Sequence, residues 1–468
     1  MITSTLSRFV VETKTDDISE AVFLAASNAL IDTLGVAVAG ASQPAAAIAA
    51  RWLEQSGARP QATVWGRAFA GSAADAAFAN GVAAHVLDFD DSHPSARGHA
   101  SASLIPCAIA AGELAGVSGR EVLAAYAIGL EVAGKIGRIF GHGHLQSGWH
   151  PTATIGLLGS AAVAARLLAL NAGELACAWG LAGSQLGGLV RNFGTMTKSF
   201  HAGQAARAGL LSAWMARQSF SADDTIFDGE GGIFAVYAGT DGEPPDVVMH
   251  SLGKPWEIVD PGNFVKRWPC CYSSHRALGG LYTLIDRHGL RPEEISEIIV
   301  SFLPGGDQAL VSRSPRTGLE GKFSIEYVIA AALLDGQLTL NTFTDAMVQR
   351  QAAQTLMRKV RRVRIPDNKV YSGISGHNDI TVITPRGRFE FRAERLPGSP
   401  AWPMTAQDRT RKFRDCAAPI LGRTRADQLL DCVERCQHLP NIRELTAVTV
   451  PANNRLKRTK TVTAPVDG

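Results

Sequence analysis

The polar segment from His85 to His99 is the part of this sequence whose residue types are best suited to chemistry. It reads HVLDFDDSHPSARGH, so carboxylates, imidazoles and a guanidinium follow one another closely between two apolar stretches. Buried charges are costly unless they are paired or hydrogen-bonded. The segment is therefore expected to be either a solvated loop between two helices or a site that binds an acid and transfers protons.

Further polar segments interrupt the apolar pattern downstream. His150 precedes Pro151, a residue that favours a helix start, and the N–H groups at a helix N-terminus attract anions. Lys198 precedes an Ala- and Gly-rich helix, and Lys266 and Arg267 are followed by Trp-Pro-Cys-Cys. These cations would hold the carboxylates of a small polyacid. Histidine is the side chain best matched to proton transfer near neutral pH.

These histidines and cationic side chains suit chemistry on the carbon atoms next to a carboxylate. Removal of an α-proton, or loss of CO2 from a β,γ-unsaturated acid, leaves an enediolate-like anion that cations and hydrogen bonds stabilise. Loss of a β-hydroxyl from such an anion is a dehydration, and reprotonation on the opposite face is an epimerisation. The residues alone leave dehydration, decarboxylation and epimerisation open.

The composition excludes several classes of protein. The chain has 468 residues, 46% of them hydrophobic and 19% charged, and a net charge of +3, so we expect no nucleic-acid or membrane partner. The 7 cysteines lack the spacing of a disulfide framework, a zinc site or an iron–sulfur cluster. The polar N-terminal residues resemble no signal peptide, and we expect a cytoplasmic protein.

The hydrophobic pattern predicts a mainly α protein. Apolar stretches at helical spacing fill residues 18–218, whereas the composition becomes mixed after residue 260, with strands expected near 298–303, 360–365, 380–384 and 389–393. We therefore predict a large all-α domain made of residues 1–262 and 400–468, with a smaller α+β lid domain, 263–399, inserted into it. The polar segments would meet in a cleft between the two domains.

Five motifs in order resemble the MmgE/PrpD family, which includes 2-methylcitrate dehydratase, cis-aconitate decarboxylase and iminodisuccinate epimerase. They are HVLDFDDS, GWHPT, TMTKSFHAG, KRWPCC and FSIEY, and the resemblance runs from about residue 10 to about residue 440. The resemblance implies a helical domain with a lid, a homodimer, and no metal or organic cofactor.

The resemblance also implies roles for single residues. Asp88, His99, His150 and Tyr327 match catalytic positions of the family. The positions that match substrate-binding ones are Ser92, Lys198 and Lys266, and Arg267 joins them for its charge. The loop after Ser92 is one residue longer than in the decarboxylase, which leaves His93 open as the alternative to His99. The position of a lid histidine in the decarboxylase is Cys271 here.

Together these features predict a cofactor-independent lyase acting on a di- or tricarboxylic acid. The leading expectation is water elimination from a 2-methylcitrate-like substrate by histidine acid–base chemistry. Decarboxylation of a cis-aconitate-like acid and epimerisation of an iminodisuccinate-like diacid are the alternatives that use the same site. A non-catalytic carboxylate-binding protein is the alternative from another class.

Overall fold

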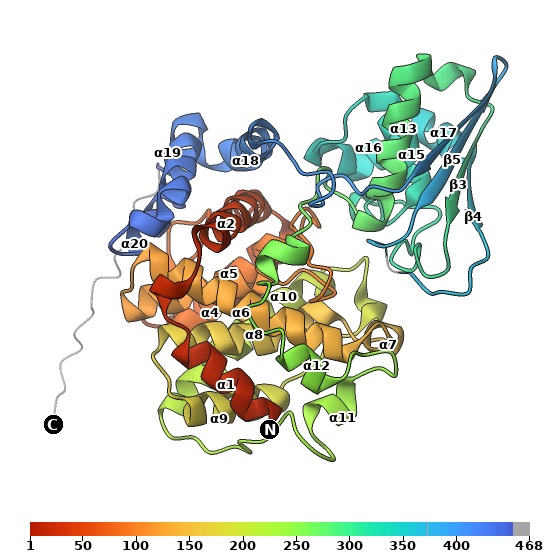
Figure 1. The fold of residues 1–468 in the computed structure, drawn as a ribbon. Coiled ribbons are helices and arrows are strands. Elements are labelled where there is room, and N and C mark those ends of the chain that lie inside the picture. The colour runs from red at the N-terminus through yellow and green to blue at the C-terminus, as the bar shows by residue number, and fades with distance from the viewer. Residues whose placement is uncertain (372, 453–468) are drawn as a thin grey trace.

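The computed structural model describes residues 1–371 and 373–452, and it consists of a large helical body with a small sheet to one side (Figure 1). The helical body draws on both ends of the chain. Its helices are α1 (Ile2–Glu12), α2 (Glu20–Gly40), α3 (Pro44–Ser56), α4 (Ala73–His85), α5 (Ser101–Ala115), α6 (Gly119–Phe140), α7 (Gly143–Gln146), α8 (Pro151–Leu167), α9 (Ala172–Gly183), α10 (Thr197–Arg217), α11 (Ile233–Tyr237), α12 (Pro245–Met249), α18 (Ala406–Leu421), α19 (Arg423–Glu434) and α20 (Arg443–Val448).

Four of these helices, α4, α5, α8 and α10, pack against one another and bring their ends together. Helices α5 and α8 are buried along nearly their whole length, as expected of helices that are apolar on all sides. Helices α4 and α10 approach closely at two glycines, because a Cβ atom on Gly81 would lie 2.8 Å from the Cα of Gly203. This contact sets the end of α4, at His85, beside the start of α10, at Lys198.

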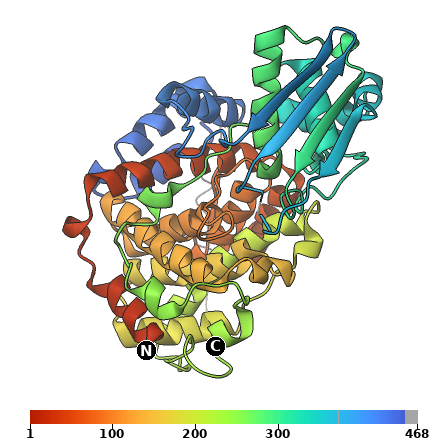
Figure 2. The same ribbon diagram turned by 45° about the vertical axis from the view of Figure 1, so that its right-hand side comes forward.

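The smaller unit is built on a four-stranded sheet with the strand order β4-β3-β5-β6 (Figure 2). The strands are β3 (Glu297–Phe302), β4 (Val360–Arg364), β5 (Asn378–Thr384) and β6 (Gly387–Ala393); only the β3–β4 pair is parallel. The helices of the unit are α13 (His275–His288), α14 (Gly318–Gly321), α15 (Ile325–Asp335), α16 (Asp345–Gln349) and α17 (Gln351–Met357). Burial alternates along β3, so the helices cover one face of the sheet.

The mainly α class is confirmed, and the sheet lies within the segment predicted to be mixed. The domain boundaries at 262 and 399 remain predictions. The expectation that Lys198 precedes its helix is wrong: α10 begins at Thr197, so Lys198 and His201 lie inside the helix. In the smaller unit, α16 and α17 are separated at Arg350, whose backbone is extended.

Helix α2 is the one described helix that is long and apolar enough to cross a membrane, with a mean hydropathy of 1.7. However, 72% of that apolar window is buried inside the structure, where α2 packs against α4 and α18. Helix α2 therefore has the surroundings of a core helix.

Candidate active site

Asp88 is the centre of a buried cluster of charged side chains. Its carboxylate accepts a hydrogen bond from Lys198 Nζ at 2.6 Å and lies 3.0 Å from Lys266 Nζ. Lys266 also donates to the main-chain carbonyl of Asp88 at 2.8 Å. The backbone of Asp88 has a φ of +51°, a left-handed conformation that is uncommon outside glycine and often found at functional sites. This turn directs both the carboxylate and the carbonyl of Asp88 towards Lys266.

The carbonyls on either side of Asp88 are also held by lysines from distant segments. Lys322, which follows α14 in the smaller unit, donates to the carbonyl of Leu87, and it donates to Pro269 at 2.9 Å. Lys412 of α18 donates to the carbonyl of Phe89 at 2.8 Å. The loop between α4 and α5 is therefore fixed by cations from the smaller unit and from the C-terminal helices.

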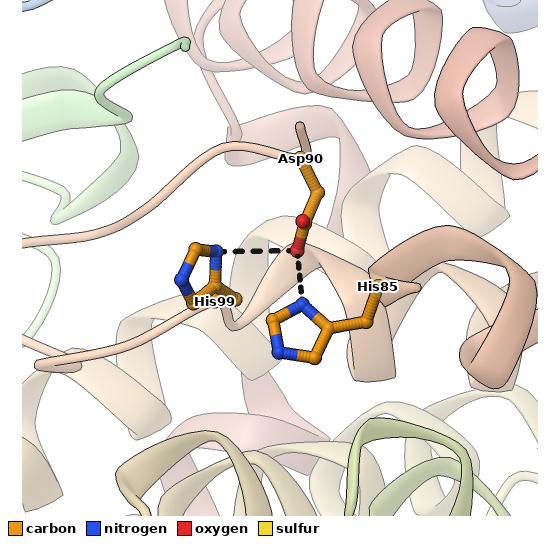
Figure 3. Close-up of side chains that lie close together, drawn as sticks. All are labelled: His85, Asp90 and His99. Atoms are coloured by element: carbon orange, nitrogen blue, oxygen red, sulfur yellow. Dashed lines mark hydrogen bonds and ion pairs between the residues drawn. The ribbon is translucent and has the colours of Figure 1, made fainter. Parts of the chain in front are cut away.

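Two imidazoles share one carboxylate oxygen beside this loop (Figure 3). Nδ1 of His85 lies 2.8 Å from Oδ2 of Asp90, and Nδ1 of His99 lies 3.2 Å from the same oxygen. Nε2 of His85 is 3.0 Å from Lys198 Nζ, which links the imidazole pair to Asp88. The side chain of His99 is 14% exposed, whereas those of His85 and Asp90 are fully buried.

A second imidazole pair lies on the other side of His85. His150 is the residue before α8, as the sequence predicts, and its Nδ1 lies 3.0 Å from Nδ1 of His201. The ring of His150 stacks 5.9 Å from the ring of His85 and meets the ring of Phe193 edge-on at 4.8 Å. Because His201 and Lys198 are three residues apart on α10, both point to the same face of that helix.

Burial and the nearby lysines keep the imidazoles of His85, His99 and His150 neutral and the carboxylate of Asp88 charged. Burial lowers the pKa of His85 to about 3, and burial with the charge of Lys198 brings the pKa of His150 well below its usual value. Burial also lowers the pKa of His99, although Asp90 opposes the shift. Burial alone would raise the pKa of Asp88, but Lys198 and Lys266 outweigh it, so the carboxyl stays ionised.

The structure distinguishes His93 from His99. Nε2 of His93 lies 2.9 Å from the carbonyl of Glu257, and its Nδ1 accepts the N–H of Ala96 at 3.2 Å, so both ring nitrogens are occupied. Nδ1 of His99 lies 2.7 Å from the carbonyl of Asp91, and Nε2 of His99 forms no hydrogen bond with any described residue. The ring of His99 therefore has a nitrogen without a protein partner among the described residues, whereas the ring of His93 has none.

Ser92 ties the loop to the segment that carries Lys266. Its N–H donates to the carbonyl of Phe264 at 2.9 Å, and the N–H of Phe264 donates back at 2.7 Å. Its hydroxyl donates to the carbonyl of Gly98 at 3.4 Å. Ser92 thus holds the site together, and a contact of Ser92 with a substrate remains a prediction.

Arg267 and Tyr327 lie apart from the cluster. The Arg267 side chain is exposed, lies over the Trp268 ring at 5.8 Å and lines a cavity of about 830 Å³ between α13 and α18. Tyr327 is fully buried in the core of the smaller unit, where its hydroxyl donates to the carbonyl of Thr342 at 2.5 Å. The structure does not bring either residue to Asp88, because Arg267 faces solvent and Tyr327 is packed inside the smaller unit.

Four members of the cluster lie outside the predicted set: His85, Asp90, His201 and Lys322. Of the two alternatives for the polar segment, the solvated loop is excluded at Asp90 and Asp91, which are 0% and 1% exposed. The spacing of His201 from Lys198 on one helix face is a signal that would have identified it. Lys322 offers no such signal, because only the tertiary structure brings it to Leu87.

The His85, Asp90 and His99 atoms lie within 4.8 Å of one another, a spacing that a metal ion could use. Lys198 and Lys266 lie beside the same group and repel a cation. The 2.8 Å contact of His85 with Asp90 is a hydrogen bond, and Nδ1 of His99 bonds to the carbonyl of Asp91 at 2.7 Å. The charges therefore favour a hydrogen-bonded group that binds an anion and transfers protons.

Comparisons with known proteins point to one family. The model of the MmgE/PrpD N-terminal domain matches residues 4–245, and that of the MmgE/PrpD C-terminal domain matches residues 268–438. The cis-aconitate decarboxylase of Homo sapiens is 28% identical over 460 residues, which cover 96% of this chain and 94% of that protein. The enzyme of the same name from Mus musculus is also 28% identical, over 95% and 92% of the two chains. That of Aspergillus terreus is 25% identical over 79% and 80%.

Proposed function

We propose that this chain, which belongs to the MmgE/PrpD family, is a lyase that removes CO2 from a small unsaturated tricarboxylic acid of the cis-aconitate class. The observation that carries the proposal is the convergence of Lys198 and Lys266 on Asp88 beside the neutral imidazoles of His99 and His150. The names of the relatives support decarboxylation at least as well as water elimination from a 2-methylcitrate-like acid, so decarboxylation becomes the leading reaction.

The lysines and His99 have different tasks in this reaction. The lysines hold substrate carboxylates, and they stabilise the dienolate that remains when the C–C bond breaks and CO2 leaves. A bound polyanion favours the protonated form of a nearby imidazole, so the neutral His99 of the free protein gains a proton with the substrate. Nε2 of His99 then delivers that proton to carbon and completes the product. These residues carry out every step, and the proposal includes no metal or organic cofactor.

Water elimination is the second candidate, and Cys271 is the observation that favours it. The resemblance places a histidine of the decarboxylase at this position, whereas Cys271 is a buried thiol whose pKa burial raises. Its N–H donates to the carbonyl of Lys322, so it lies next to the lysine that holds the loop. A neutral thiol is a weak hydrogen-bond donor compared with an imidazole, and a different substrate would follow from that change.

A mass-spectrometric screen tests the reaction class. Chelator-treated protein is incubated with cis-aconitate, 2-methylcitrate, citrate and iminodisuccinate, next to a His150→Ala variant, and released CO2 is trapped. We expect loss of CO2 from cis-aconitate, and no loss with the variant, because the imidazole of His150 belongs to the cluster.

The other outcomes of the screen are equally distinct. Loss of water from 2-methylcitrate would establish the second candidate, and a change in optical rotation without a change in mass would indicate the epimerase alternative. Turnover of none of the four acids by folded protein, combined with saturable binding of cis-aconitate, would replace the lyase with a non-catalytic carboxylate-binding protein.

We further propose that the protein is a homodimer that pairs through an apolar face on α3 and α10. Exposed side chains follow one face of α10 at helical spacing, and α3 continues the face. The side chains of this face have the exposed fractions Ile48 52%, Trp52 47%, Phe200 45%, Leu211 36% and Trp214 46%. A row of exposed apolar side chains on a surface helix is typical of an interface, and a second copy is the partner that the family resemblance implies.

Replacing Trp214 by glutamate is expected to convert the dimer to a monomer, because two charges would be buried at a symmetric contact. Light scattering at micromolar concentration measures the mass directly. The matched control is Leu24→Glu on α2, where a leucine of 65% exposure lies outside this face. A monomeric unmodified protein, or a Trp214→Glu variant that remains dimeric, would contradict the proposed interface.

A further inference from the structure

The carboxylate of Asp90 lies between two imidazoles and forms no ion pair with a lysine or arginine of the described residues. Its Oδ2 contacts Nδ1 of His85 and Nδ1 of His99, while Oδ1 is buried without a hydrogen-bond partner among the residues that the structure describes. An ionised carboxylate only accepts hydrogen bonds, and Nδ1 of His99 also lies 2.7 Å from the carbonyl of Asp91, another acceptor. The proton of each ring must therefore lie on Nδ1. That arrangement leaves Nε2 of each ring as the atom that accepts a proton.

The two Nε2 atoms have different surroundings. Nε2 of His85 faces Lys198 Nζ at 3.0 Å and accepts a hydrogen bond from that ammonium. Nε2 of His99 forms no hydrogen bond with the described residues, and the His99 side chain is the most exposed of the three, at 14%. A proton that arrives at the group therefore has one open position, Nε2 of His99. The resulting imidazolium lies 3.2 Å from the Asp90 carboxylate.

From this geometry we propose that Asp90 is a positioning residue, which holds His85 and His99 as one hydrogen-bonded unit and supplies the negative charge that lets His99 carry a proton on Nε2. The inference rests on the proposed function only in that the proton is destined for substrate carbon. The role resembles that of an aspartate that orients a histidine and stabilises its imidazolium in other acid–base sites.

Other charges act on His99 as well. Lys266 and Lys198 lower its pKa, and the neighbouring imidazole of His85 lies 4.6 Å from its ring. Asp88 is held by the two lysines and is therefore largely neutralised. Asp90 is thus the charge in the cluster that is free to balance an imidazolium at His99.

The test follows protonation directly and needs no substrate. Protein labelled with 13C and 15N in histidine is observed by NMR, with the His99 and His85 signals assigned through His99→Gln and His85→Gln. In the unmodified protein at neutral pH we expect both rings to carry the proton on Nδ1. In Asp90→Asn we expect the pKa of His99 to fall by about one unit or more, because a counter-charge in hydrogen-bond contact has been removed.

Glu113→Gln is the matched control, since Glu113 is another buried carboxylate, bonded to Thr63 and Thr446 far from the cluster. It should leave the His99 titration unchanged. With cis-aconitate as the probe, Asp90→Asn should lower kcat about 100-fold while KM changes little, as for other groups that orient a catalytic residue.

Several results would overturn the inference. A proton on Nε2 of either ring in the unmodified protein is one, and it can be seen even if Asp90→Asn does not fold. An unchanged His99 titration in folded Asp90→Asn is another. Loss of both Nδ1 protons on addition of one equivalent of Zn2+ would show a metal site instead. One further outcome separates the two proposals. If the protein shows the expected titration shift but turns over no cis-aconitate, the proposed function is refuted and the role of Asp90 is supported.

Discussion

Replacing Lys198 by methionine is expected to lower kcat/KM by about 1,000-fold, the upper range for loss of one charged group that stabilises a reacting anion. Lys198 supplies one N–H to Asp88 at 2.6 Å and faces Nε2 of His85 at 3.0 Å, which leaves its third N–H for a substrate carboxylate. Methionine has a similar length and no charge. The variant thus loses the substrate contact and leaves Asp88 with Lys266 as its remaining ammonium partner.

The measurement is steady-state kinetics on cis-aconitate, with thermal unfolding to verify the fold. Arg217→Met is a suitable control, because Arg217 is an exposed cation at the other end of the same helix. Lys198→Arg should not restore activity, since the guanidinium is larger and planar and the position is 7% exposed. If kcat/KM of the Lys198→Met variant lay within threefold of the unmodified value, Lys198 would have no role in substrate binding or catalysis.

Replacing His99 by glutamine should lower kcat by about 1,000-fold with little change in KM, within the range for loss of a general acid or base. His93→Gln should keep turnover within a fewfold, because both nitrogens of His93 bond to the protein itself. That variant should instead lose about 1–3 kcal/mol of stability, the cost of leaving buried partners unsatisfied. Kinetics and thermal unfolding of the two variants separate catalysis from structure.

The pH profile distinguishes the two candidate reactions at the same residue. Burial lowers the pKa of His99 below 6.5, so the His99 imidazole of the free enzyme is neutral at pH 7. If His99 delivers a proton, kcat/KM rises as the pH falls from 8 towards that lowered pKa and levels off below it, after correction for ionisation of the substrate. If His99 removes a proton, as in dehydration, kcat/KM is constant above pH 6.5 and falls below its pKa.

The residues at helix ends were predictable because local signals mark them. Pro151 fixes the start of α8 and hence the place of His150, and the apolar stretches on both sides of Asp88 indicate a loop between two core helices. The periodicity of the later segments likewise gave the strands of the sheet within a few residues. These features depend on residues close in the sequence.

The contacts between distant segments were not predictable in this way. Nothing near Lys322 indicates that it reaches Leu87, and nothing near Arg267 indicates that its side chain faces Trp268 and solvent. His85 has the pattern of a core residue at the end of an apolar helix, yet its ring bridges Asp90 and Lys198. Such positions depend on how α4, α10 and the smaller unit pack, which a single sequence does not specify.

Two of the lysines that hold the loop around Asp88 lie late in the chain, so the loop can reach its final structure only late in translation. Lys412 bonds to the carbonyl of Phe89 and pairs with Asp32 at 2.6 Å, and Lys322 bonds to the carbonyl of Leu87. A nascent chain still emerging from the ribosome has made every imidazole of the cluster long before α18 exists. Until then Asp32 and the carbonyl of Phe89 lack their cation, and buried groups without partners destabilise the loop. Activity should therefore appear only when synthesis is nearly complete.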